Sequence, residues 1–578
     1  MTISMSKQRP NIGSILTKLL LAYLIITFIL FPIISMFGIV FVKDGHLSFS
    51  AVRRVFSSPK AMRSIKNSLL LALTMIVTVN LSGTLAVLIM DYWDIKGSKM
   101  LRLAYMTPLI YGQITLAMGY KFVYGKAGFV TNLLLKIFPN WNPNWFMGYG
   151  AVAFLMTFAC TQNHLMFLSS AIKNIDGNII EAGRSMGASG AKIFFKIVLP
   201  ILKPSYFAIT VLTFLTGMSA LSAPLVLGGD NFQTINPMIV MFAQSPRSRD
   251  ISAFLAVLLG CTTIILMTIL NQLEKHGTYM SLSKTKTKLQ KQKIQNPVSA
   301  VIINALAWIM FVIYVLPIFC VVLFSFTNGL AVKTGVLAKG CFTLQNYKNL
   351  FTKMSAFKPY LVSICYSLAA AVIVSLISII VARIVIKGKS RFKALWEYSV
   401  LIPWLLPSTL IALSLMLSFD VRRILVGNRV LVGTAVLLLI GYVIVKLPFS
   451  FRMIRAAFFG INDDMEEAAK TMGAGQVRIM AQIIIPYIMP VVSSVIVLNF
   501  NNLLSDYDMS VFLYSPRLKP LGIIIKDATD QTATVDAVAM GLVYSVVLMV
   551  ISAFAIWFSR RDPSARRKKK IATAVQQN

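Results

Sequence analysis

The stretch Glu181-Ala-Gly-Arg-Ser-Met-Gly187-Ala188 recurs as Glu467-Ala-Ala-Lys-Thr-Met-Gly473-Ala474, at an offset of 286 residues. In both places the nine residues after the glycine lead to a motif that ends in proline, Ile197-Val-Leu-Pro200 and Ile483-Ile-Ile-Pro486. Self-similarity at one fixed offset indicates an internal duplication. Because the offset is about half of the 578 residues, we expect two homologous halves.

Composition places both halves in a membrane. Hydrophobic residues make up 57% of the chain and charged residues only 13%, whereas soluble domains carry about 25% charged residues. Runs such as Leu19 to Val42 and Leu69 to Met90 are long enough to cross about 30 Å of hydrocarbon. Backbone groups in lipid must be bonded within the segment, so these runs should be helices. We therefore predict an all-α polytopic membrane protein.

The apolar runs divide into six predicted spans in each half, about twelve transmembrane helices in all. An even number of spans places both termini on the same side of the membrane. The predicted spans are 16–42, 67–91, 101–123, 150–172, 203–228 and 251–271, then 299–326, 361–387, 396–419, 429–448, 487–505 and 538–558.

These spans give the domain organisation. Each half contains one copy of the repeated motif in a loop between its fourth and fifth spans. The predicted parts are a first half over 1–271 with its loop at about 173–200, a basic and flexible linker over 272–298, a second half over 299–558 with its loop at about 449–486, and a basic tail over 559–578.

The net charge of +36 is explained by topology. Lys and Arg gather in the cytoplasmic loops of helical membrane proteins, and a basic cluster follows the last predicted span at Arg560, Arg561, Arg566 and Arg567. We therefore predict that both termini are cytoplasmic and that the lipid bilayer surrounds the spans. The chain lacks a Cys/His zinc pattern and an aromatic–basic motif, so we expect no nucleic acid partner.

The repeated motif has the features of a short amphipathic helix outside the membrane. Asp176 and residues 462–464 place hydrogen-bond acceptors where such a helix would start. Gly187 and Gly473 allow the chain to turn at its end, and Pro200 and Pro486 are predicted to begin the next element. A short helix held away from the membrane can lie in a groove on a partner protein.

At this motif the chain resembles the permeases of binding-protein-dependent ABC importers, with the fold typical of type I importers. Their cytoplasmic loop carries Glu-Ala-Ala, three residues, Gly, nine residues and Ile-x-Leu-Pro. The first copy departs at Gly183 and the second at Ile485. The resemblance implies that two copies of an ABC ATPase subunit contact these loops. The residues concerned are Glu181, Ala182, Gly187, Ala188 and Pro200, with Glu467, Ala468, Gly473, Ala474 and Pro486.

Within that family, fused two-copy permeases look most like the ferric-iron branch. Pro108, Pro403 and Pro407 lie within the third span of each half as in that branch, and the stretches 125–128 and 510–514 resemble its loops. The resemblance implies that an extracytoplasmic solute-binding protein delivers the solute, with ferric iron expected and phosphonate, sugar-phosphate, thiamine or polyamine as alternatives. It also implies a bacterial cytoplasmic membrane.

Catalytic chemistry is expected on another chain. The sequence contains no Gly-x-x-x-x-Gly-Lys-Ser/Thr phosphate loop. We therefore expect this chain to be no enzyme, to have no catalytic residue or metal site and to bind no cofactor, with ATP-Mg bound by the partner subunit.

Polar residues in the fifth span of each half mark a predicted substrate path. Polar groups within apolar spans are costly and tend to face a cavity. The offset of 286 residues sets Ser219 and Ser222 opposite Ser505 and Asp508, and hard oxygen donors suit ferric iron. An alternative is that these residues begin a hydrated outer loop. The predicted path residues are Ser219, Ser222, Asn501, Asn502, Asp506 and Asp508.

Two other functions are compatible with twelve spans. One is a secondary transporter driven by an ion gradient, which should carry ionisable relays within its spans. The other is a membrane scaffold without transport activity. His164, in the fourth predicted span, is interpreted as a packed and hydrogen-bonded residue rather than a path residue.

Overall fold

The fold is a bundle of helices, described by a computed structural model over residues 12–109, 111–276, 287, 289–294, 296–387, 393–461, 463–530 and 532–559. A short hairpin of β1 (Val42–Lys43) and β2 (His46–Leu47) is its one named sheet within those ranges. The predicted all-α fold is confirmed. Asn462 and the basic tail from Arg560 onward lie outside the described residues.

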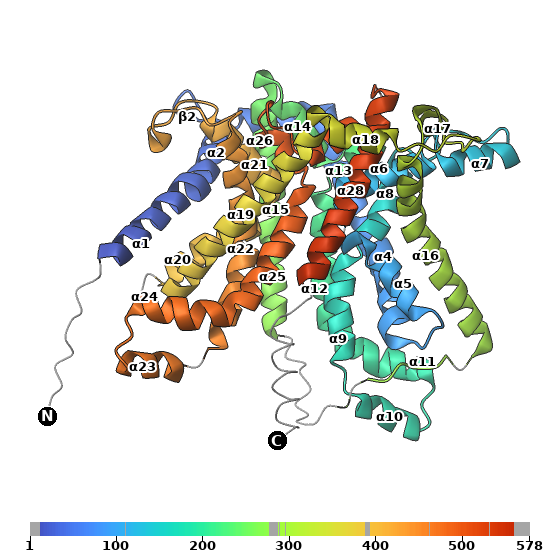
Figure 1. Cartoon of the computed structure of the whole chain (residues 1–578), viewed down its shortest axis with the longest axis horizontal. Coiled ribbons are helices and arrows are strands. Elements are labelled where there is room, and N and C mark those ends of the chain that lie inside the picture. The colour runs from blue at the N-terminus through green and yellow to red at the C-terminus, as the bar shows by residue number, and fades with distance from the viewer. Residues whose placement is uncertain are drawn as a thin grey trace.

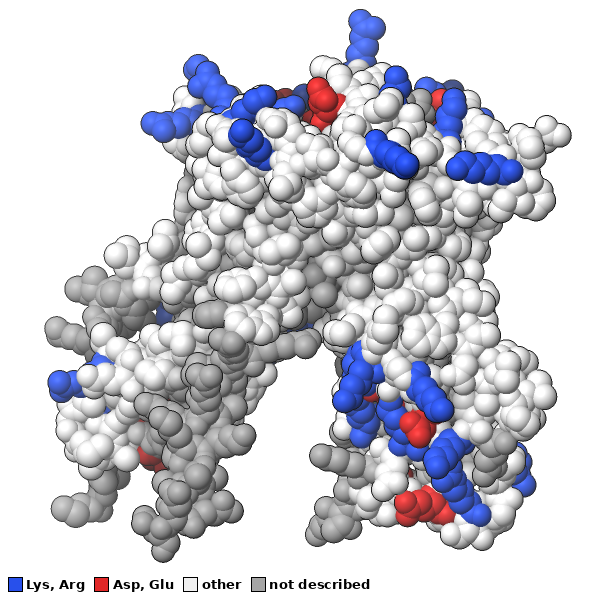
Figure 2. Space-filling model, turned by 45° about the vertical axis from the view of Figure 1, so that its right-hand side comes forward, with Lys and Arg blue, Asp and Glu red and all other residues white. Residues whose placement is uncertain are grey.

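Ten helices in the described part of the chain are long and apolar enough to cross a membrane. Charged side chains lie at the two ends of the molecule and are sparse in the band between them, as Figure 2 shows. The spans are built on α1 and α2 (Ile12–Ile25, Phe31–Phe41), α4 (Pro59–Val87), α8 (Tyr149–Ala159), α12 (Leu199–Met218), α15 (Arg249–His276), α16 (Pro297–Ser325), α19 (Met354–Lys387), α22 (Ala435–Phe459), α25 (Ile485–Leu504) and α28 (Val535–Ser559).

The third span of each half, one of the about twelve predicted, is broken rather than continuous. In the second half, the helices on either side of the break meet at 104°. Proline lacks the N–H group that helix continuation needs, and Pro108, Pro403 and Pro407 lie at the breaks. The pieces are α5 (Ser98–Tyr105), η3 (Thr107–Leu109) and α6 (Gln113–Tyr124), then α20 (Lys393–Leu401), η7 (Ile402–Leu405) and α21 (Ser408–Phe419).

The fifth span of each half begins earlier than predicted. One helix runs continuously over Gly190–Met218 and its counterpart over Gln476–Leu504. Pro200 and Pro486 lie in the first turn of α12 and α25, as predicted, but each of these helices continues a helical segment that precedes the proline. A π-helical turn precedes each proline, η5 (Phe194–Val198) and η9 (Met480–Ile484). The wider turn accommodates the proline ring and its missing N–H within a continuous helix.

The two halves interlock through their first helices. Helix α2 of the first half packs against α21, and α16 of the second half packs against α5 and α6. At the first contact the rings of Phe31 and Phe419 lie 6.1 Å apart. At the second, the Tyr105 hydroxyl donates a hydrogen bond to the Ala307 carbonyl at 2.7 Å. The halves thus form one bundle (Figure 1).

Part of the predicted linker is hydrogen-bonded to the first half. We call Thr287 with residues 289–294 the linker strap. The Gln292 N–H donates to the Tyr92 carbonyl at 2.7 Å, and the Asp94 N–H donates to the Gln292 carbonyl at 3.0 Å. The Gly177 N–H donates to the Thr287 carbonyl at 3.0 Å. Backbone hydrogen bonds thus hold the strap beside the first copy of the repeated motif.

Candidate functional site

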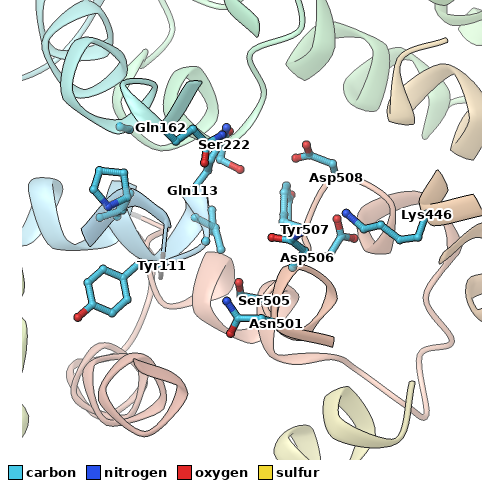
Figure 3. A pocket seen from close by; sticks show the side chains of 16 residues that line it. Tyr111, Gln113, Gln162, Ser222, Lys446, Asn501, Ser505, Asp506, Tyr507 and Asp508 are labelled. Carbon is cyan, nitrogen blue, oxygen red and sulfur yellow. The ribbon is translucent and has the colours of Figure 1, made fainter. Parts of the chain in front are cut away.

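A polar pocket of about 340 Å³ lies between the two halves, and we call it the central pocket. Its side chains come from the broken third span, from the ends of α8 and α13 (Ser222–Leu227), from α22, and from the end of α25 with the segment after it. In Figure 3, Gln113 and Ser222 of the first half lie across the opening from Asp506 and Asp508 of the second. The polar lining residues are Tyr111, Gln113, Gln162, Ser222, Lys446, Asn501, Asn502, Ser505, Asp506, Tyr507 and Asp508.

The break in the first half supplies one wall of the pocket. Pro108, Tyr111, Gly112 and Gln113 all line it. Irregular backbone at membrane depth is tolerated where it lines a cavity or is buried in protein. A Cβ added to Gly112 would lie 2.1 Å from the Ser505 hydroxyl oxygen. Only glycine therefore permits this close approach between the halves.

Two aspartates from the second half line the pocket, and only one of them is held by hydrogen bonds. Asp506 Oδ2 accepts hydrogen bonds from the N–H groups of Met509 and Ser510 at 3.1 and 3.3 Å, at the start of α26 (Ser510–Leu513). Asp508 has no hydrogen bond or ion pair to any residue that the structure describes.

Lys446 is a pocket residue that the sequence interpretation missed. The predicted span ended at residue 448, which placed this lysine at the edge of the membrane. Helix α22 instead continues to Phe459, so Lys446 lies near its middle. In Figure 3 its ammonium group points toward Asp506 and Asp508. A lysine inside an apolar run is the signal that would have identified it.

Asn501 adds an unsatisfied polar atom to the same wall. The residue is 8% exposed, and its side-chain oxygen is buried with no hydrogen-bond partner among the described residues. A buried polar atom without a partner costs free energy unless water or a ligand satisfies it. Asn501 lines the pocket, but this oxygen atom is itself not exposed to it.

The structure brings five of the six predicted path residues to the pocket. Ser222, Asn501, Asn502, Asp506 and Asp508 line it. It does not bring the sixth there.

That sixth residue, Ser219, instead donates its hydroxyl hydrogen bond to the Leu215 carbonyl in its own helix at 2.7 Å. Tyr111, Gln113 and Gln162 were missed because they lie at breaks between helices, which spacing along a regular span does not reveal.

His164 lies outside the pocket lining and agrees with its interpretation as a packed residue. Its side chain is fully buried, and its Nε2 atom lies 2.9 Å from the Asn80 side-chain oxygen. An added Cβ on Gly83 would meet the imidazole ring at 2.4 Å. The ring therefore serves the packing of α4 against the fourth span.

The repeated motif forms two short helices at the end of the bundle away from the hairpin. They are α10 (Gly177–Ser185) and α23 (Asp463–Thr471), and both project beyond the spanning helices (Figure 1). Asp176 caps α10, since its side chain accepts a hydrogen bond from the Asn178 N–H at 3.1 Å. This confirms the acceptor predicted at the start of the first motif.

Both helices end in the same turn. Gly187 and Gly473 have φ angles of +76° and +82°. The Ala188 N–H donates to the Gly183 carbonyl at 3.0 Å, and the Ala474 N–H donates to the Ala469 carbonyl at 3.0 Å. These bonds, with a left-handed glycine, define a Schellman motif. The predicted role of the two glycines as helix-ending turns is confirmed.

The two copies also expose the same side chains. Glu181, Ala182 and Gly187 are exposed in the first copy, as are Glu467, Ala468 and Gly473 in the second. The next positions, Ala188 and Ala474, are half-buried in both. One surface is therefore presented twice.

Comparison with known proteins gives related permeases over nearly the whole chain. A family model described as a binding-protein-dependent transport system inner membrane component matches residues 374–561. The probable ABC transporter permease protein y4fN of Sinorhizobium fredii is 34% identical over 544 residues, covering 94% of this chain and 95% of the relative. The ferric transport system permease protein FbpB of Actinobacillus pleuropneumoniae is 23% identical and covers 96% and 80%.

Among solved structures, a bacterial ABC transporter involved in the import of alginate is 19% identical, with a TM-score of 0.39, and covers 46% of this chain and 97% of its own. The near full-length match to y4fN assigns the family. It decides against the secondary transporter and the scaffold considered above. The chain is a multi-pass membrane protein that belongs to the permeases of binding-protein-dependent ABC importers.

Proposed function

We propose that α10 and α23 are the elements through which two separate ATPase subunits drive this permease. ATP-Mg would be bound and hydrolysed on those subunits, because this chain contains no phosphate-binding Gly-x-x-x-x-Gly-Lys-Ser/Thr loop. The two helices would lie at the cytoplasmic face of a bacterial cytoplasmic membrane, with both termini on that side.

One observation carries this proposal. Two segments 286 residues apart fold into helices with the same capping turn and the same exposed Glu-Ala pair, at the same end of the bundle. Two identical ATPase subunits on the cytoplasmic side would each bind one copy of this surface. A mechanical contact of this kind is what a permease without its own ATPase needs.

The central pocket is the proposed solute site between the halves. An extracytoplasmic binding protein would deliver solute to the opposite end of the bundle, and closure of the ATPase subunits would expose the pocket to one side at a time. Its position at the junction of the halves, lined by residues of both, supports this role.

Ferric iron stays the first candidate for the solute. The FbpB relatives are named as ferric transport permeases, and Asp506 and Asp508 supply hard oxygen donors. The alternatives are phosphonate, sugar-phosphate, thiamine and polyamine; the PotC relative of Haemophilus influenzae is named for spermidine and putrescine. Uptake of labelled iron should fall in the Asp506→Ala, Asp508→Ala double variant. Unchanged iron uptake would remove iron from the candidates.

Charge reversal tests the ATPase contact. The Glu181→Arg, Glu467→Arg double variant should lose co-purification with the ATPase subunit and lose ATP-dependent uptake. Asp94→Arg is the matched control, since Asp94 is an exposed acid beside the linker strap and outside both helices. Unchanged assembly and uptake in the double variant would contradict the docking role.

A further inference from the structure

Three charged groups converge on the central pocket without pairing with one another. No ion pair joins Lys446 to Asp506 or Asp508, although all three are described and all line the same cavity. Asp508 has neither a hydrogen bond nor an ion pair with any described residue. Charged groups within a membrane protein normally pair with each other or with a ligand. The pocket therefore holds a cation and a carboxylate that interact across a gap rather than in direct contact, so each can still bind a group of a ligand.

Charge balance limits what can occupy this site. The two carboxylates and one ammonium group give a formal charge of −1 when all are ionised. A bare trivalent ion would leave two positive charges uncompensated in a site of low dielectric constant, where uncompensated charge is costly. An occupant whose own negative groups offset most of its positive charge fits better.

The uncharged side chains of the lining can both donate and accept hydrogen bonds, so a matching solute carries both kinds of group. Gln113, Gln162 and Asn502 each offer an amide N–H₂ group as well as an oxygen. A volume of about 340 Å³ holds a small organic molecule or a small metal complex, and exceeds what a single ion fills.

We propose that the central pocket binds a solute that presents a positive and a negative group together, the positive group to Asp508 and the negative group to Lys446. This inference rests on the pocket being the solute site. Two sources share the chemistry: a small zwitterion with an ammonium group and an oxyanion, or a ferric ion held by an organic acid. Each presents an oxyanion that Lys446 can bind through a charge-assisted hydrogen bond.

Uptake by the assembled transporter, with its ATPase and binding protein, separates these sources. The labelled probes are ferric citrate, the zwitterions β-alanine and 2-aminoethylphosphonate, the cation putrescine, and the anion glycerol 3-phosphate. Uptake confined to the zwitterions identifies the first source, and uptake confined to ferric citrate identifies the second. Uptake of putrescine or glycerol 3-phosphate alone, or of no probe, overturns the inference.

The direction in which Lys446→Met changes uptake decides whether the solute carries an oxyanion. Loss of a charged partner for the oxyanion should lower uptake of the transported probe at least about tenfold, and Lys446→Arg should retain most of it. If the solute were a cation without an oxyanion, Lys446→Met would leave uptake unchanged or raise it, because a repulsive charge is removed. Lys339→Met, an exposed lysine outside the pocket, is the control.

The outcome is separable from failure of the proposed function. Co-purification with the ATPase subunit reports assembly and does not depend on the pocket charges. Assembly retained with uptake insensitive to both Lys446→Met and Asp508→Asn overturns the inference alone. Loss of assembly in the Glu181→Arg, Glu467→Arg variant together with lower uptake in Lys446→Met supports both claims.

Discussion

Helices α10 and α23 present the same surface but are anchored to the bundle by different forces. Under α23, the Glu466 side chain is only 7% exposed and accepts hydrogen bonds from Arg383 at 2.6 and 3.0 Å. Lys387 and Lys470 each lie 3.3 Å from the same carboxylate. The second copy is therefore held by an ionic cluster that reaches directly into α19.

Under α10 the corresponding position is Ile180, which is 1% exposed. It belongs to an apolar cluster with Ile193 and other first-half residues. An added Cβ on Gly183 would lie 3.1 Å from Ile197 Cδ1, so the helix sits close against the fifth span. Asp176 ties the start of α10 to the linker strap, because its Oδ1 atom also accepts a hydrogen bond from the Thr287 N–H at 3.3 Å.

The comparison separates what the duplication kept from what it changed. The outward Glu-Ala pair and the glycine turn are the same in both copies, whereas the inward anchor is apolar in one and ionic in the other. Arg383 lowers the pKa of Glu466 to about 2. The cluster's contribution to stability is therefore complete above the ordinary glutamate pKa of about 4.3 and is lost only as pH falls toward 2.

The largest effect is expected at the ionic anchor. Glu466→Ala leaves the partly buried Arg383 without its carboxylate, which should cost about 3 kcal/mol in the local opening of α23. Amide hydrogen exchange over residues 463–471 measures that opening. Exposed Glu467→Ala is the adjacent control and should change exchange by less than about 0.5 kcal/mol. Equal effects at the two positions would refute the ionic anchor.

The apolar anchor should respond almost as strongly. Ile180→Ala removes a fully buried side chain, and we expect a cost of about 2–3 kcal/mol confined to α10. The same exchange experiment over residues 177–185 reports it. Ile179, which is 37% exposed, provides the neighbouring control substitution to alanine. Loss of protection in α23 as well would show that the two anchors are coupled, against this account.

A smaller effect is expected where the linker strap meets α10. Asp176→Ala removes a helix cap and should cost about 1 kcal/mol. Because the same carboxylate accepts from the Thr287 N–H, the amide of Thr287 should also exchange faster. Asp176→Asn keeps an acceptor oxygen and should lose only part of the protection. An unchanged Thr287 amide in the alanine variant would argue against the strap contact.

The smallest effects on stability are expected from exchanging alanine and glycine between the two copies, and they should have opposite signs. Ala469→Gly should destabilise α23 by up to about 1 kcal/mol through backbone entropy. Gly183→Ala should gain less than that, because the new methyl group must displace Ile197 by a few tenths of an ångström. Thermal unfolding of the two variants measures the difference. A full gain in Gly183→Ala would mean that α10 is less closely packed than described.

The sequence predicted the features that local patterns encode. The duplicated motif located both exposed helices, and its glycines required their left-handed turns. The anchors were not predictable, because Glu466 meets Arg383 only after 83 residues of chain fold back between them. Lys446 was missed for a similar reason: whether a lysine flanks a span or lies inside it depends on where the helix ends, and α22 ends at Phe459.

Labelling from each side of the membrane tests the central claim most directly. Met186 and Met472 are 80% and 81% exposed at the ends of the two motifs. In a chain whose five cysteines are replaced, Met186→Cys and Met472→Cys should react with a membrane-impermeant maleimide only from the cytoplasmic side. The ATPase subunit should protect both positions. Reaction of the two positions from opposite sides of the membrane would contradict the account.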